Sequence, residues 1–123
     1  MTPGRCNGVQ SRKLASLAEA ALEDVKARDV RVIDVRKLTT VADYMIIATG
    51  TSDRHVRSLA DRVVEQATGA GCRPLGVEGE EAGEWVLVDL QDVIVHVMLG
   101  KVRDLYKLEN LWDMHAPSAG AVV

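Results

Sequence analysis

Two apolar runs, residues 84–90 and 93–99, constrain the fold of this chain more than any other feature of its sequence. Side chains alternate between the two faces of a strand, so two such runs joined by a short turn predict a β-hairpin. With a two-residue turn, Leu90 lies opposite Val93 and one face becomes wholly aliphatic. That face collects Val86, Val88, Leu90, Val93, Val95 and Val97. It must be covered, which predicts a sheet packed against helices.

The other face of the hairpin is chemically mixed. It collects Trp85, Leu87, Asp89, Ile94, His96 and Met98. In one interpretation a helix or a second subunit covers Trp85 and Met98, and His96 is an ordinary half-buried histidine. In the other, the face is exposed and binds a partner, because interfaces favour aromatic anchors, adaptable methionines and a polar rim. The two interpretations are compatible if the partner is another protein.

Charge favours a basic partner for this part of the chain. Between Pro74 and Gly100 there is no Lys or Arg, whereas six carboxylates occur: Glu78, Glu80, Glu81, Glu84, Asp89 and Asp92. The whole chain has a formal net charge of -3 at pH 7. Non-specific affinity for nucleic acid depends on clustered Lys and Arg, so this balance argues against a chain that itself wraps RNA or DNA.

The remaining patterns alternate between helix and strand. Apolar residues at helical spacing predict an amphipathic helix over 12–28, with Ser11 as its N-cap. The same spacing predicts a second helix, which begins after the capping residues 51–53 and ends at Gly69. Strands are predicted over 30–36, 44–49 and 72–77. The last of these is expected at an edge of the sheet, because Pro74 cannot donate a hydrogen bond to a neighbouring strand. A short helix is predicted over 101–105. We therefore expect an α/β (α+β) domain over 12–114, with a mixed five-stranded sheet and helices on one face. Residues 1–11 and 115–123 are predicted to be flexible.

Cysteine and hydropathy patterns favour a reducing, cytoplasmic setting. Cys6 and Cys72 are too few for a disulfide framework, and they lack the spacing of metal ligands. The apolar stretches are too short to cross a bilayer, and residues 1–11 resemble neither a signal peptide nor a transit peptide. We expect no cofactor and no metal site.

Several ordered motifs resemble the ribosomal silencing factor family, also called the Iojap family. The similar segments span residues 43–52, 54–57, 73–79, 84–89, 96–98 and 106–112. The resemblance covers about residues 14–113 of the 123. It implies a nucleotidyltransferase-like fold without enzymatic activity, and a bacterial protein that binds the large ribosomal subunit through large-subunit protein fourteen. By occupying that site, the protein would block joining of the small subunit and repress translation when nutrients are scarce.

The resemblance also implies that the mixed sheet face contacts the partner. Its predicted contact residues are Trp85 as the apolar anchor, Glu84 and Asp89 as acceptors for Lys or Arg, and Leu87, His96 and Met98 beside them, with Arg103 and Tyr106 at the edge. For Tyr106, packing of the C-terminal segment on the sheet is an equally open interpretation. Family members are often dimers, so a homodimer that uses an overlapping surface is a further expectation.

The rival class is a nucleotide-binding protein or enzyme. Gly50, Thr51 and Ser52 lie between a predicted strand and a helix N-terminus, where backbone amides can hold a phosphate. Two-metal nucleotidyl transfer needs closely placed carboxylates, however, and no Asp-x-Asp follows this turn. Simple helix capping by residues 51–53 is the favoured interpretation, and His55 is expected to lie on a solvated helix face.

Overall fold

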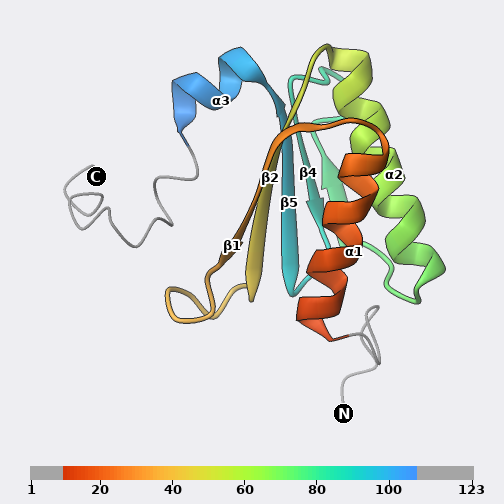
Figure 1. Ribbon diagram of the computed structural model, residues 1–123, viewed down its shortest axis with the longest axis vertical. Helices are drawn as coiled ribbons and strands as arrows, with labels where there is room; N and C mark the ends of the chain where they lie inside the picture. Colours follow the sequence, from red (N-terminus) through yellow and green to blue (C-terminus); the bar gives the residue numbers. More distant parts are fainter. Residues whose placement is uncertain (1–9, 108–123) are drawn as a thin grey trace.

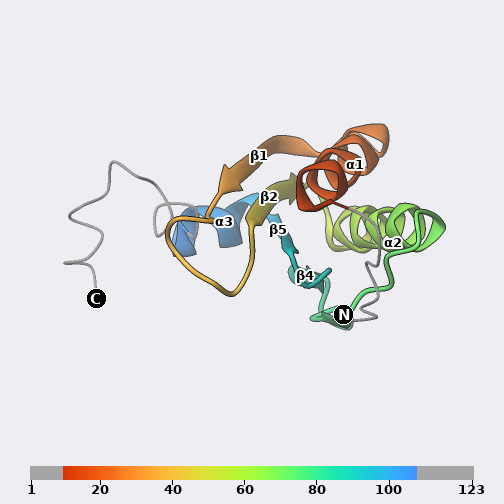
Figure 2. The same ribbon diagram turned by 90° about the horizontal axis from the view of Figure 1, so that it is seen from below.

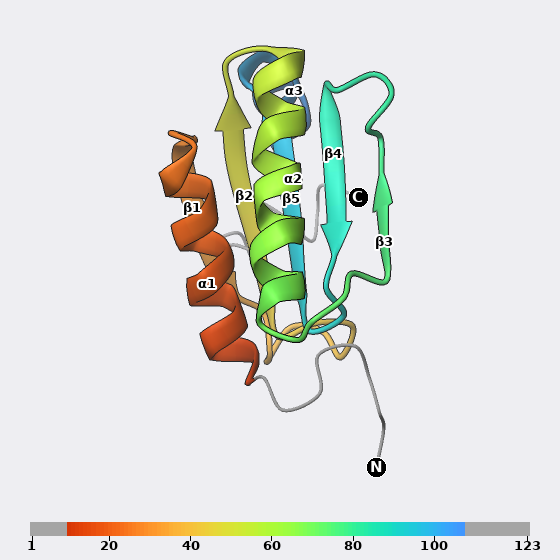
Figure 3. The same ribbon diagram turned by 90° about the vertical axis from the view of Figure 1, so that its right-hand side faces the viewer.

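Five strands form one mixed sheet in the order β1-β2-β5-β4-β3. The computed structural model describes residues 10–107. Its strands are β1 (Arg28–Asp34), β2 (Tyr44–Gly50), β3 (Gly76–Glu78), β4 (Trp85–Asp89) and β5 (Val93–Leu99). The central pair, β2 and β5, is parallel, and the other neighbours are antiparallel (Figure 3). This architecture confirms the predicted mixed five-stranded sheet.

Two long helices cover one face of this sheet. They are α1 (Ser11–Asp24) and α2 (Asp53–Gly69), which lie side by side in Figures 1 and 3. A third helix, α3 (Gly100–Tyr106), starts directly after β5 and lies on the opposite face (Figures 1 and 2). The predicted fold class, with the two long helices on one face of the sheet, is confirmed. The short helix was also predicted, but its position on the second face was not. It lies there because Val102 of α3 is apolar and packs against side chains of the second face.

The main core lies between the sheet and the two long helices. The backbone N–H of Leu90 donates to the carbonyl oxygen of Val93 at 2.9 Å, which confirms the predicted two-residue turn. All six aliphatic side chains of the predicted hairpin face are fully buried in this core. Burial of a side chain such as leucine or valine contributes about 1.5–3 kcal/mol, so this face provides much of the hydrophobic stabilisation.

A smaller apolar cluster occupies the opposite face of the sheet. Its buried members are Val35, Met45, Ile47 and Met98, and Ile33, Trp85 and Val102 pack against them while half-buried. Met45 and Ile47 belong to β2, whose alternate residues face the main core instead. Both faces of the central strand are therefore buried, which explains its continuous apolar sequence.

The helix boundaries differ in part from the predicted ones. Helix α1 begins at Ser11, and its N-cap is Gln10, so the prediction of Ser11 as the cap is wrong. The helix ends at Asp24 rather than at residue 28, because the chain turns at Lys26, whose φ is 64°. At α2 the prediction is confirmed, since the Ser52 hydroxyl accepts a 3.0 Å hydrogen bond from the backbone N–H of His55.

Two other expectations concern the edges of the described region. Strand β3 is an edge strand, as Pro74 predicted, but it begins at Gly76 rather than at residue 72. Cys72 is fully buried and disulfide-bonded, which differs from the expected reduced state: two cysteines are too few for a disulfide framework but sufficient for one bond. Flexibility was predicted for residues 1–11 and 115–123; Ser11 instead belongs to α1, with Gln10 as its N-cap, and residues 1–9 and 115–123 lie outside the described residues. No helix within residues 10–107 is long and apolar enough to span a membrane.

Candidate partner-binding face

The α3 face, defined here as the side of the sheet opposite α1 and α2, carries the mixed side chains that the hairpin predicted. Trp85 pairs with Met98, Leu87 with His96 and Asp89 with Ile94 across the antiparallel β4–β5 ladder. Residues two apart on a strand share a face, so these pairs form three successive layers on one side of the sheet. The predicted division of the hairpin into an aliphatic face and a mixed face is confirmed.

Burial on this face is greater than the sequence predicted. Met98 is fully buried, and His96 is only 6% exposed. For these two side chains the interpretation of an exposed face is therefore wrong, and the burial agrees with the other interpretation, in which a helix covers Met98. Helix α3 begins one residue after β5, so its Val102 and the indole of Trp85 lie against Met98. The same indole lies beside the imidazole of His96, with the ring centroids 5.9 Å apart.

His96 acts as a buried hydrogen-bond acceptor for Trp85. The indole Nε1–H donates to His96 Nδ1 at 3.0 Å, so this ring nitrogen carries no proton. Burial of the imidazole lowers its pKa from 6.5 to about 4, because a charged ring would lose its hydration there. His96 is therefore neutral at pH 7, and it fixes the orientation of the Trp85 indole rather than offering a charge to a partner.

Tyr106 and Trp85 form the exposed aromatic part of the α3 face. Their ring centroids lie 5.0 Å apart with an interplanar angle of 49°, a tilted packing that aromatic pairs favour. Trp85 is half-buried, whereas Tyr106 is 58% exposed. Leu105, at 75% exposure, lies next to it in α3 and was not among the predicted contact residues. Its only sequence signal was an apolar residue in a short helix, which does not distinguish exposure from burial.

Arg103 ties α3 to the sheet. Its Nη1 donates to the carbonyl oxygen of Asp29 at 2.6 Å and to Thr49 Oγ1 at 2.9 Å. These acceptors belong to β1 and β2, so one guanidinium connects three elements. The side chain predicted at the edge of the contact surface thus already has partners within the protein.

The two acidic residues predicted as acceptors lie at opposite ends of β4. Glu84 is exposed and directly precedes β4. Asp89 is half-buried at the far end of β4, where its Oδ1 accepts a 2.8 Å hydrogen bond from the backbone N–H of Gln91. Gln91 has a φ of 77°, so this bond stabilises a strained turn. Leu87 is half-buried between these two acidic residues.

His55 lies outside this face and joins the two long helices. Its Nε2 is 2.7 Å from the carbonyl oxygen of Val25, and its Nδ1 accepts from the backbone N–H of Thr51 at 2.9 Å. The ring is half-buried, so the expectation of a solvated position is wrong. Within residues 10–107, no group of three or more His, Cys, Asp or Glu side chains is arranged to hold a metal ion.

Comparison with known proteins gives consistent results. Residues 9–121 match the family described as "Ribosomal silencing factor during starvation". The ribosomal silencing factor RsfS of Chromobacterium violaceum is 47% identical over 110 residues, which is 89% of this chain and 90% of that protein. The factor of the same name from Bacillus subtilis is 38% identical over 104 residues, covering 85% of this chain and 88% of that one.

More distant relatives and solved structures agree with this match. A mouse protein named "Mitochondrial assembly of ribosomal large subunit protein 1" is 29% identical over 119 residues, covering 94% of this chain and 52% of the mouse protein. A crystal structure of a Chromobacterium violaceum protein superposes with a TM-score of 0.83 at 48% identity, covering 85% of this chain and 87% of that one. A Bacillus halodurans structure gives a TM-score of 0.75 at 35% identity, with 82% and 94% covered.

Proposed function

Because this chain belongs to the ribosomal silencing factor family, we propose that it silences ribosomes by binding the large subunit. In this proposal it docks on large-subunit protein fourteen in the bacterial cytoplasm and sterically blocks joining of the small subunit when nutrients are limited. The names of the bacterial relatives support ribosome silencing, and the name of the mouse relative refers to the large subunit. The protein acts by occupying a surface, so no chemical step is required.

The observation that carries this proposal is the aromatic pair on the α3 face beside an acidic segment. Tyr106 is exposed and stacks on Trp85, whose orientation His96 fixes. Rigid aromatic side chains with small entropy losses are the usual energetic centre of a protein interface. Residues 75–99 add carboxylates and no Lys or Arg, which suits the basic surface of a typical ribosomal protein.

The burial of the predicted residues assigns them different roles within this proposal. Tyr106, Trp85 and Leu105 would make the apolar contact, and Glu84 would accept from Lys or Arg of the partner. Leu87 and Asp89 are half-buried and would lie toward the rim. Met98, His96 and Arg103 would act indirectly, by supporting the indole and α3 from below.

Sedimentation with isolated large subunits tests the proposal. We expect the purified protein to co-sediment with large subunits and to reduce the yield of intact ribosomes when small subunits are added. Failure to co-sediment at moderate salt would contradict the proposed function. The yield of intact ribosomes separates silencing from simple binding, because a factor that binds elsewhere on the subunit would leave joining unchanged.

Two surface variants locate the contact. We expect Tyr106→Ala and Glu84→Arg each to weaken binding by at least about tenfold, since truncation of a central interface residue costs about 2 kcal/mol or more. Glu23→Arg is the matched control, because Glu23 is equally exposed but belongs to α1 on the other side of the sheet. Wild-type binding by both test variants, with unchanged thermal melts, would exclude Tyr106 and Glu84 as contact residues.

A further inference from the structure

The two central parallel strands end where the chain diverges to opposite faces of the sheet. Gly50 of β2 pairs with Leu99 of β5, so the carboxyl ends of the two strands lie side by side. After β2 the chain enters α2 on one face, and after β5 it enters α3 on the other (Figure 1). In open α/β sheets, such a divergence between adjacent parallel strands leaves a crevice that commonly binds ligands.

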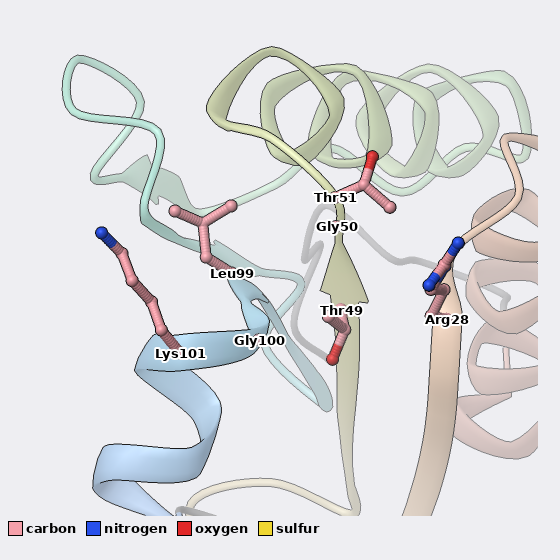
Figure 4. Close-up of a pocket in the computed structure, with 7 residues that line it drawn as sticks. All are labelled: Arg28, Thr49, Gly50, Thr51, Leu99, Gly100 and Lys101. Atoms are coloured by element: carbon pink, nitrogen blue, oxygen red, sulfur yellow. The ribbon is translucent and has the colours of Figure 1, made fainter.

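A pocket of about 470 Å³ occupies this crevice. It is lined by Arg28, Thr49, Gly50, Thr51, Leu99, Gly100 and Lys101, which come from the start of β1, the ends of β2 and β5, and the start of α3 (Figure 4). Its volume falls within the range of about 300–1,000 Å³ that is typical of small-molecule sites. The fold thus places a pocket of ligand size at the position where the topology favours one.

The lining of the pocket suits an anion. It contains two cations, Arg28 and Lys101, and the hydroxyls of Thr49 and Thr51, but no carboxylate. Figure 4 shows Arg28 and Lys101 on opposite sides of the end of β2. Two cations on opposite sides of a pocket suit an anion that carries negative charge at both of its ends. The lining also contains no aromatic side chain on which a nucleobase could stack.

We propose that this pocket binds a small molecule that carries at least two phosphate groups, held by Arg28 and Lys101 and by the hydroxyl of Thr49, which accepts from Arg103 and keeps its own proton to donate. Charge-assisted hydrogen bonds from Arg and Lys are the strongest contacts that a protein offers to phosphate. Recognition rests on the phosphates, so nucleoside triphosphates and inorganic polyphosphates belong to the same ligand class. The proposal concerns binding only, and it is independent of the ribosome-binding function proposed above.

Isothermal titration calorimetry with four probes tests this inference. The probes are ATP, inorganic tripolyphosphate, orthophosphate and adenosine. Each is titrated up to about 5 mM, because a small open pocket is expected to bind its ligand with a Kd of up to about 1 mM. We expect ATP and tripolyphosphate to bind with similar affinity, orthophosphate to bind more weakly, and adenosine not to bind. This order would show that the phosphates, and more than one of them, carry the affinity.

Three variants tie binding to the pocket. We expect Arg28→Gln and Lys101→Gln each to weaken tripolyphosphate binding by about tenfold, the size of one hydrogen bond to a charged group. Gly100→Asp should abolish it, because a Cβ at Gly100 has only an ordinary 3.8 Å contact with Thr49 Cγ2, and the new carboxylate would repel the anion. An acidic residue also suits the first turn of a helix, so α3 should persist. Lys13→Gln, an exposed cation of α1, is the matched control.

Three results would overturn the inference. The first is no heat of binding with either ATP or tripolyphosphate. The second is equal affinity for the wild type, Arg28→Gln and Lys101→Gln. The third is binding of a short single-stranded RNA when ATP and tripolyphosphate do not bind, which would identify a surface for RNA instead of a small-molecule site. If Gly100→Asp fails to show a cooperative thermal transition, the two Gln variants decide the question.

Discussion

Protonation of the buried imidazole of His96 should destabilise the folded protein as the pH falls. The pKa of His96 is about 4 in the folded state and 6.5 without the protein environment, a difference of about 2.5 units. A lowered pKa means that the unfolded chain binds the proton more readily than the folded one. The neutral ring is therefore fully compatible with the fold above pH 6.5, and stability is lost progressively as the pH falls from 6.5 towards 4.

The size of the effect follows from these two pKa values. Linkage between protonation and folding predicts that His96 alone lowers the free energy of unfolding by about 2 kcal/mol between pH 7.5 and pH 5. The full difference of 2.5 units corresponds to about 3.4 kcal/mol at still lower pH. This figure reflects burial of the imidazole, and protonation of Nδ1 also removes the acceptor of the Trp85 N–H.

Urea unfolding at the two pH values measures this loss, with His96→Asn as the comparison. Asn does not titrate, and its side-chain oxygen can still accept from the indole of Trp85. We expect the wild type to lose about 2 kcal/mol more than the variant between pH 7.5 and pH 5, a difference of about 1 M in urea midpoint. All other ionisable groups are present in both proteins, so their contributions cancel. Equal losses in the two proteins would refute the reasoning.

Three further substitutions test contacts elsewhere in the fold. His55→Ala removes two hydrogen bonds of about 1 kcal/mol each and should lower Tm by about 6–10 °C. Arg54→Ala, at the exposed neighbouring position, should change Tm little, and equal Tm values for the two variants would contradict the role of His55. Arg103→Gln should speed amide exchange in α3 about tenfold without affecting α2, and unchanged exchange would show that the guanidinium does not hold α3. Gly79→Ala should lower the free energy of unfolding, measured with urea, by at least about 2 kcal/mol, because φ is +90° and a Cβ would collide with the backbone of Trp85. A Cβ at Gly69 meets open space, so Gly69→Ala is the control, and similar stabilities of the two variants would exclude backbone strain at residue 79.

Strand alternation made the hairpin predictable from the sequence. A shift of one residue between Trp85 and Met98 would have mixed aliphatic and polar side chains on both faces, so only registers of the observed parity place all the valines on one face. The cap at Ser52 was equally predictable, since a hydroxyl before an apolar periodic segment has a direct local partner. These predictions succeeded because neighbouring residues decide them.

The misplaced residues depend on contacts between segments that are distant in sequence. Periodicity could place His96 on the mixed face, but its burial depends on the path of the chain after Leu99 and on the indole of Trp85 above it. His55 likewise lies in a polar first helical turn, and its acceptor is the carbonyl oxygen of Val25, thirty positions earlier. No local pattern contains that information.

Helix α3 would link the two proposed sites, because it is short and contributes residues to both. It is seven residues long, so its ends are separated by about 10 Å at 1.5 Å per residue. Lys101 at its start lines the pocket, and Tyr106 at its end stacks on Trp85. Thermodynamic linkage requires reciprocity: a pocket ligand that changes ribosome affinity by some factor must have its own affinity changed by the same factor when the ribosome binds.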